Sequence, residues 1–125
     1  MSLFQKKDPS RVSICDTIVI GGVAGTGIKS AGKIIARALI EIGYEVFLTD
    51  EYPSLIKGGH NAVMISFSPY PVYTINREID LLVCLDRETF DEHKGNLNSN
   101  SIVVHDPSNF KIVEKDLRDL AAEVV

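Results

Sequence analysis

The fold is decided by residues 17–50, which read TIVIGGVAGTGIKSAGKIIARALIEIGYEVFLTD. The β-branched run at residues 17–20 predicts a buried strand, and Gly21 and Gly22 after it predict a turn. Apolar residues then recur at three- and four-residue steps over residues 28–42, which predicts a helix with one apolar face. That expected face consists of Ala31, Ile34, Ile35, Ala38, Leu39 and Ile42, and Gly43 is the expected cap.

The rest of the chain alternates in the same way between apolar runs and helical patterns. The further predicted strands are residues 45–49, 61–67, 81–85 and 102–105, and the further predicted helices are 88–94 and 116–123, with a loop at 95–100. The first strand, the first helix and the second strand make a βαβ unit, for which we expect a right-handed crossover and two parallel strands. The predicted fold class is α/β: a three-layer αβα sandwich, Rossmann-like, with a mainly parallel sheet.

One domain is expected. Residues 1–15 are polar and predict an N-terminal strap, and residues 16–125 form the domain itself. Because no strand follows the helix predicted at 116–123, we expect this domain to be truncated at its carboxyl end.

Composition excludes several classes of function. The 125 residues carry 13 Lys and Arg against 17 Asp and Glu, a net charge of −4, which argues against general nucleic-acid binding and against a polybasic membrane surface. No apolar run approaches the ~20 residues of a membrane span, and we expect no secretory signal. Cys15 and Cys84 belong to no metal-ligand cluster, so we expect reduced thiols, no metal site and a cytoplasmic location.

The glycine-rich segment at residues 21–27, GGVAGTG, joins the first strand to the helix. It is either a tight turn that binds nothing or a place where an anion meets the N–H groups of the helix start. As a nucleotide P-loop it has the right glycine spacing, but Ile28 is inserted before Lys29. One extra helical residue rotates a side chain by ~100°, so this lysine does not match a P-loop lysine.

Two other anion-binding interpretations remain open for the same segment. As a dinucleotide-binding turn it matches at Gly25 and Gly27, has Ser30 in place of the third glycine, and has Asp50 near the position of a ribose-binding acid. As a looser phosphate site it is followed by a basic stripe at four-residue steps, which consists of Lys29, Lys33 and Arg37. A plain alternative for the stripe is a solvated charged face, with Arg37 paired to Glu41.

A second segment, residues 51–61, reads EYPSLIKGGHN and follows the second strand at the carboxyl edge of the sheet. Ligands of open α/β sheets bind at that edge. Its paired glycines predict a sharp turn, beside which Lys57, His60 and Asn61 supply donors. Histidines 60, 93 and 105 and the cysteines assemble no nucleophile set, so the chain shows no catalytic centre of its own.

These motifs carry a resemblance to a known family. Residues 20–68, IGGVAGTGIKSAGKIIARALIEIGYEVFLTDEYPSLIKGGHNAVMISFS, resemble the γ domain of 2-oxoacid:acceptor (ferredoxin) oxidoreductases, in the form in which this domain begins a longer α subunit. The likeness continues through residues 79–93, IDLLVCLDRETFDEH, and covers residues 17–125. Pyruvate, 2-oxoglutarate and ketoisovalerate ferredoxin oxidoreductases make up this family.

The resemblance implies part of an enzyme that decarboxylates a 2-oxoacid, passes electrons to ferredoxin and forms an acyl-CoA. Thiamine diphosphate, magnesium and iron–sulfur clusters are then expected in partner domains or subunits only, and coenzyme A at this domain. The implied cofactor-binding residues are Gly22, Gly25, Thr26, Gly27, Lys29 and Ser30. The implied interface or active-site-facing loop consists of Glu51, Tyr52, Lys57, Gly58, Gly59, His60 and Asn61.

Expected partners are the other domains or subunits, ferredoxin indirectly, and a second copy of the chain in a homodimer. Tyr52, Leu55 and Ile56 make the loop apolar enough for such contacts. The isolated chain is expected to be inactive. The alternative functions are a nucleotide- or dinucleotide-binding Rossmann-like protein and a non-catalytic interaction domain whose glycine turn binds nothing.

Overall fold

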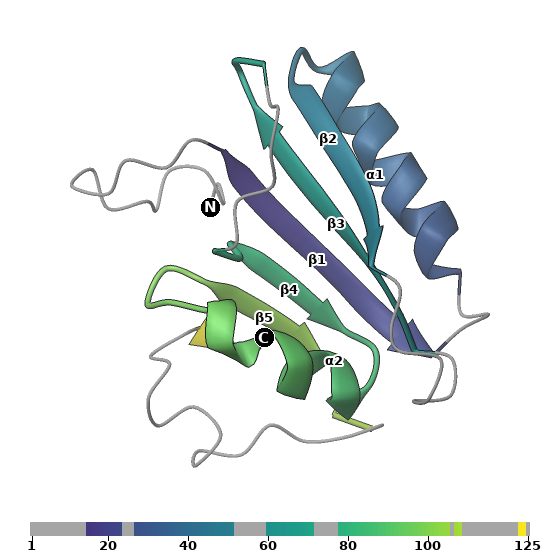
Figure 1. Cartoon of the computed structure of the whole chain (residues 1–125), viewed down its shortest axis with the longest axis vertical. Helices are drawn as coiled ribbons and strands as arrows, with labels where there is room; N and C mark the ends of the chain where they lie inside the picture. Colours follow the sequence, from purple (N-terminus) through teal and green to yellow (C-terminus); the bar gives the residue numbers. More distant parts are fainter. Residues whose placement is uncertain are drawn as a thin grey trace.

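A computed structural model of the chain describes residues 15–23, 27–51, 60–71, 78–105, 107–108 and 123–124. The described part contains a six-stranded sheet with the order β2-β3-β1-β4-β5-β6 (Figure 1). The strands are β1 (Asp16–Val23), β2 (Glu45–Glu51), β3 (His60–Ser68), β4 (Leu81–Cys84), β5 (Ile102–His105) and β6 (Glu123–Val124). The helices are α1 (Ile28–Glu41), α2 (Arg87–His93) and the single 3-10 turn η3 (Lys94–Asn96).

The sheet combines parallel and antiparallel pairing. Strands β1, β4, β5 and β6 pair in parallel, one after the other. Strand β3 lies between β2 and β1 and is antiparallel to both. Strands β1 and β2 therefore run in the same direction, as the βαβ unit predicts, but they are not neighbours. The insertion of β3 between them was not predicted from the sequence.

The two α-helices cover opposite faces of the sheet. Along β1, Ile18 and Ile20 belong to one core cluster together with Ile28 and Leu39 of α1. Val19 points the other way and belongs to a second cluster, which includes Phe90 of α2. Because side chains alternate between the faces of a strand, the two clusters are separate layers of core. This arrangement confirms the predicted three-layer αβα sandwich.

The buried face of α1 differs from the predicted one. Its buried residues are Ile28, Gly32, Ala36 and Leu39, whereas Ile34 and Ile42 are 69% and 70% exposed. The reason is close packing: a Cβ at Gly32 would lie 2.9 Å from Cγ2 of Val63 on β3. The helix approaches the sheet through its small residues, and this turns Ile34, Ala38 and Ile42 of the expected face toward solvent.

The turn predicted at Gly21 and Gly22 is wrong, because both glycines lie inside β1 and are buried. A Cβ at Gly21 would lie 2.5 Å from Cγ2 of Thr89 on α2. A Cβ at Gly22 would lie 2.8 Å from Cβ of Leu85 and 3.0 Å from Cδ1 of Ile28. These glycines therefore let the helices and the loop after β4 approach the strand, and the chain does not turn there.

The other predicted elements are found with small changes of boundary. The strands predicted at 61–67 and 102–105 correspond to β3 and β5, and the helix at 88–94 corresponds to α2 followed by η3. The helix predicted to end at Glu123 is wrong at that residue, because Glu123 lies in β6 and pairs with Ile102 of β5. Residues 116–122 of that prediction and residues 1–14 of the strap lie outside the described residues. None of the helices in the described part has the length and apolar character that a membrane crossing requires.

Candidate functional site

The sheet brings the two sequence motifs to one edge. In the ladder between β1 and β3, Val23 is opposite His60 and Gly22 is opposite Asn61. In the ladder between β2 and β3, Glu51 is opposite Ala62. The last residues of β1 and β2 therefore lie beside the first residues of β3. The strand ends that flank the glycine turn and the EYPSLIKGGHN segment are neighbours, as the sequence predicts for a carboxyl-edge site.

Helix α1 starts at the same edge with an open N-terminus. Gly27 is its N-cap, with a left-handed backbone at φ 81°, and its carbonyl accepts a hydrogen bond of 2.9 Å from the Ala31 N–H. A side chain at this φ would be strained, although a Cβ there would meet nothing within 4 Å. In the described part of the chain no side chain caps this end, and the first turn holds no acidic residue. A helix start without a side-chain cap or a first-turn acid suits an anion.

Lys29 makes an ion pair that sequence reasoning missed. Its Nζ lies 3.8 Å from Oδ2 of Asp50 on β2, and the two side chains are 49% and 34% exposed. An exposed pair of this kind contributes only about 0–1 kcal/mol, so a bound anion can compete for the lysine. Asp50 is the residue that the dinucleotide interpretation takes as the ribose acid, and here it faces a lysine. The sequence places Lys29 in the first turn of the helix and Asp50 near the end of the next strand, but chain order alone does not report their contact.

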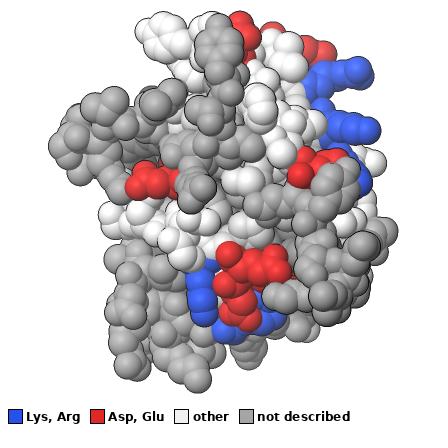
Figure 2. Space-filling model, in the orientation of Figure 1, with Lys and Arg blue, Asp and Glu red and all other residues white. Residues whose placement is uncertain are grey.

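The rest of the basic stripe is exposed. Lys33 and Arg37 follow Lys29 along α1, and Figure 2 shows Lys and Arg gathered along one side of the molecule. The pairing considered between Arg37 and Glu41 is not found among the ion pairs of the described residues. The stripe is thus a solvated charged face with one paired member.

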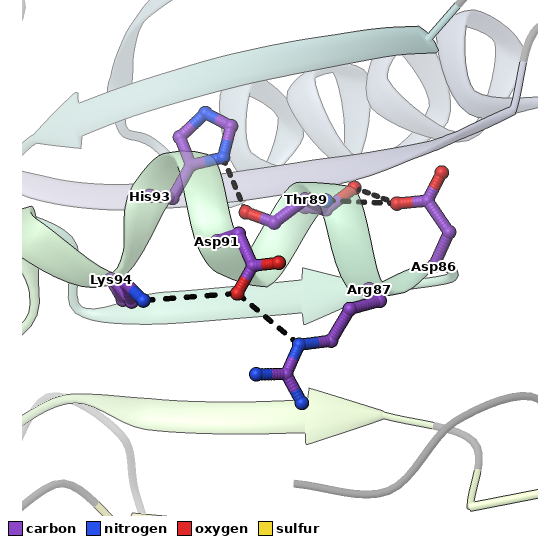
Figure 3. A network of polar contacts seen from close by, with 6 residues as sticks. All are labelled: Asp86, Arg87, Thr89, Asp91, His93 and Lys94. Carbon is purple, nitrogen blue, oxygen red and sulfur yellow. Dashed lines mark hydrogen bonds and ion pairs between the residues drawn. The ribbon is translucent and has the colours of Figure 1, made fainter. Parts of the chain in front are cut away.

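The end of β4 contributes an acidic residue whose geometry is fixed. Asp86 caps α2: its Oδ1 accepts hydrogen bonds from the Thr89 N–H at 2.9 Å and the Thr89 hydroxyl at 2.6 Å (Figure 3). Because Thr89 also packs on Gly21, the cap fixes α2 against β1. Burial, and to a lesser degree the Asp86 charge, raises the pKa of the Cys84 thiol to about 12. Cys84 is therefore a neutral thiol at physiological pH.

The described histidines and cysteines form no reactive constellation. His93 is buried, and its Nδ1 lies 2.8 Å from the carbonyl oxygen of Thr89 (Figure 3). Cys15 and Cys84 are free and buried. Over the described ranges, no group of three His, Cys, Asp or Glu side chains is arranged to hold a metal ion.

The predicted site residues fall into four groups. Gly27, Lys29 and Ser30 are exposed at the start of α1, and Asn61 is half-buried on β3. Gly22 is buried inside β1 against Leu85 and Ile28, so its Cα faces protein. Glu51 and His60 are known only as strand ends. The remaining predicted residues, Gly25, Thr26, Tyr52, Lys57, Gly58 and Gly59, lie outside the described residues.

Fold and site together define an α/β domain in which the strand ends next to two sequence motifs, GGVAGTG and EYPSLIKGGHN, lie at the carboxyl edge of the sheet. Residues 17–124 match the family described as Pyruvate ferredoxin/flavodoxin oxidoreductase, and the chain belongs to this family. A curated relative, the 2-oxoacid:ferredoxin oxidoreductase subunit alpha of a Sulfolobus species, is 41% identical over 75 residues, which are 60% of this chain and 12% of the relative. The chain thus spans a small part of that subunit's length.

Solved structures have the same fold. The gamma subunit of keto/oxoacid ferredoxin oxidoreductase from Geobacter sulfurreducens PCA aligns with a TM-score of 0.73 at 21% identity, over 90% of this chain and 59% of that one. A chain of the 2-oxoglutarate:ferredoxin oxidoreductase from Magnetococcus marinus, solved with 2-oxoglutarate, coenzyme A and succinyl-CoA bound, aligns with a TM-score of 0.75 at 22% identity. It is matched over 90% of this chain and 20% of that one. At these identities the likeness establishes the fold.

Proposed function

We propose that this chain is a domain or subunit of a thiamine-diphosphate-dependent 2-oxoacid:ferredoxin oxidoreductase, which decarboxylates a 2-oxoacid oxidatively to an acyl-CoA. Membership of the family supports the reaction class. The observation that carries the proposal is the pairing of β1 with β3, in which Val23 is opposite His60. This pairing brings together the strand ends next to the glycine-rich segment and the EYPSLIKGGHN segment, which are the two motifs that carry the family resemblance.

In this proposal, the chain and its partners have different roles. Thiamine diphosphate, with magnesium, supplies the decarboxylation chemistry from another domain or subunit, and iron–sulfur clusters there deliver electrons to ferredoxin. This chain contributes a binding surface and is inactive alone. Residues 51–61, from the last residue of β2 to the second residue of β3, make up the segment that faces the neighbouring domain, and a homodimer through this segment is part of the proposal. The cytoplasmic location expected from the sequence remains a prediction.

We assign the diphosphate of coenzyme A to the start of α1. Among the described residues, the helix start at Gly27 without a side-chain cap, the absence of a first-turn acid and the half-exposed side chain of Lys29 all favour a diphosphate there. Ser30 adds a hydroxyl, and Gly25 and Thr26 precede it in the sequence. Coenzyme A and succinyl-CoA are bound in the related Magnetococcus marinus enzyme, which agrees with this assignment.

The test is reconstitution. The chain, or the longer polypeptide that contains it, is co-expressed with the remaining oxidoreductase subunits and purified as a complex. We expect ferredoxin reduction that requires a 2-oxoacid, coenzyme A and thiamine diphosphate, and none from the chain alone. Acceptor reduction by the chain alone, or a complex that reduces ferredoxin without thiamine diphosphate, would contradict the proposal.

A further inference from the structure

Gly22 lies between the start of α1 and the residue that follows β4. It is buried in β1, and a Cβ at this position would lie 2.8 Å from Cβ of Leu85 and 3.0 Å from Cδ1 of Ile28. Leu85 directly follows β4, and Ile28 is the first residue of α1, which begins at the end of the molecule where β1 finishes (Figure 1). The missing side chain at Gly22 therefore lets the first residue of α1 lie directly against β1.

The side chain of Ile28 has little room to move away from Gly22. Ile28 is 4% exposed and belongs to one core cluster with Ile20, Leu39 and Val63. Because side chains in a core are closely packed, an added methyl group is accommodated only by shifts of the atoms around it. At Gly22 such a shift would pass through Ile28 to the first turn of α1.

This first turn holds the groups that we assign to the diphosphate of coenzyme A. The N–H groups at the start of a helix point beyond it, and Lys29 and Ser30 directly follow Ile28. Gly27 precedes Ile28, and its carbonyl accepts the hydrogen bond of 2.9 Å from the Ala31 N–H. Hydrogen bonds from cationic nitrogens to anionic oxygens have a narrow range of lengths, about 2.7–2.9 Å. A displacement of the first turn by a few tenths of an ångström would therefore weaken its hold on a phosphate group.

We propose that Gly22 is a positioning residue for the diphosphate site. It does not contact the ligand; it lets Ile28 lie on β1, and this fixes where the first turn of α1 presents its N–H groups and Lys29. This role differs from the direct contact with the cofactor that the family resemblance implies, because the Cα of Gly22 faces Leu85 and Ile28. The inference rests on the proposed function, in which the start of α1 binds coenzyme A.

The neighbouring Gly21 offers a matched comparison. It is also buried in β1, but a Cβ there would lie 2.5 Å from Cγ2 of Thr89 on α2. Helix α2 covers the opposite face of the sheet from α1. Gly21→Ala therefore crowds the core at least as closely as Gly22→Ala does, but away from α1. A loss of coenzyme A affinity that occurs only in Gly22→Ala would distinguish positioning from general destabilisation.

The experiment titrates coenzyme A calorimetrically into the reconstituted complex that contains the chain. We expect Gly22→Ala to raise the dissociation constant by about fivefold or more, and Gly21→Ala to bind like wild type. The double variant Gly22→Ala/Ile28→Val lacks Cδ1 of Ile28 and should regain most of the lost affinity, with Ile28→Val alone as its baseline. It should still unfold at lower urea concentration than wild type, because the close contact with Cβ of Leu85 remains. Urea unfolding also checks that each variant is folded.

The outcomes separate this inference from the proposed function. If the wild-type complex does not bind coenzyme A, the assignment of the diphosphate and the positioning role both fail. If wild type binds and Gly22→Ala binds equally well, the positioning role alone fails. Equal losses in Gly21→Ala and Gly22→Ala, or a double variant that binds no better than Gly22→Ala, would also overturn it. Should Gly22→Ala not fold, a double variant that binds like Ile28→Val supports the positioning role, and one that binds more weakly overturns it.

Discussion

The two ends of the sheet differ in whether their polar groups are buried and hydrogen-bonded or exposed. At the amino end of the parallel strands, buried polar groups form hydrogen bonds with one another. Oδ2 of Asp80 accepts a 2.8 Å hydrogen bond from the Thr17 N–H, and the Thr17 and Ser66 hydroxyls lie 3.0 Å apart. Nearby, the Ser101 hydroxyl donates to the Ile79 carbonyl oxygen at 2.6 Å. At the carboxyl end, α1 starts without a side-chain cap and the Lys29–Asp50 pair is exposed.

Under the proposed function, this difference separates stability from ligand binding within one small domain. A buried hydrogen-bond network is costly to disrupt and specifies how strands meet. The exposed glycine, lysine and helix end contribute little to the fold, and we propose that they bind a ligand. Substitutions at the amino end should therefore change unfolding, and substitutions at the carboxyl end should change binding.

The largest effect is expected at Asp80. Asp80→Ala removes the acceptor of the buried Thr17 N–H, and we expect the free energy of unfolding to fall by about 2–3 kcal/mol. Urea unfolding measures it. The exposed control Asp91→Ala, which loses two surface ion pairs, should cost at most about 1 kcal/mol. Equal losses in the two variants would show that the amino-end network is not a special source of stability.

The next largest effect is expected at Gly21, in the part of β1 that approaches the carboxyl edge. Gly21→Ala places a methyl group 2.5 Å from Cγ2 of Thr89, so we expect a loss of about 1–3 kcal/mol in the free energy of unfolding. Gly95→Ala is the matched control, because a Cβ at Gly95 meets nothing within 4 Å. If both variants unfold like wild type, the close contact between β1 and α2 does not explain this glycine.

The existence and order of strands β1 to β5 and the fold class could be predicted because they depend on local pattern. Residues 102–105 form an apolar run between polar segments, and β5 has those bounds. Gly21 was misassigned because a glycine needed for close packing looks the same in sequence as a glycine needed for a turn. The packing partner, Thr89, is 68 positions away (89 − 21), and sequence pattern does not report such contacts.

The buried face of α1 and part of the candidate site also depend on contacts that sequence pattern does not report. Periodicity located the helix, but Gly32 against Val63 decided which side was buried. For the site, the sequence supplied the motifs and the carboxyl edge, since both follow from chain order. It did not supply the Lys29–Asp50 pair, because that contact depends on how α1 lies against the edge strand.

The third prediction concerns alkaline pH and the carboxyl end of β4. The Cys84 thiol has a pKa of about 12 in the folded chain against its ordinary value of 9.0, so the unfolded chain loses this proton first as pH rises. The contribution of Cys84 is therefore complete below pH 9.0 and declines between there and about 12, by up to about 1.4 kcal/mol per pH unit.

Unfolding free energies of wild type and Cys84→Ala, measured at several pH values, isolate this contribution. The alanine variant starts lower because it leaves a small cavity, but its slope above pH 9.0 should be shallower than that of wild type. Parallel slopes would mean that the thiol ionises as easily in the folded chain as in the unfolded one.

The smallest effect, and the one that tests the carboxyl end as a binding site, is expected at Lys29. Lys29→Ala should weaken the binding of coenzyme A or inorganic phosphate by about 1 kcal/mol, roughly fivefold in dissociation constant, because a charge-assisted hydrogen bond is lost. The fold should change by less, since the pair with Asp50 is exposed and a cation in the first turn opposes the helix dipole. Calorimetric titration and urea unfolding measure the two quantities, with Lys94→Ala in η3 as the matched control for removal of one exposed lysine. If Lys29→Ala lowers the free energy of unfolding and leaves anion affinity unchanged, the lysine serves the fold, and the division between a stable amino end and a binding carboxyl end does not hold at this residue.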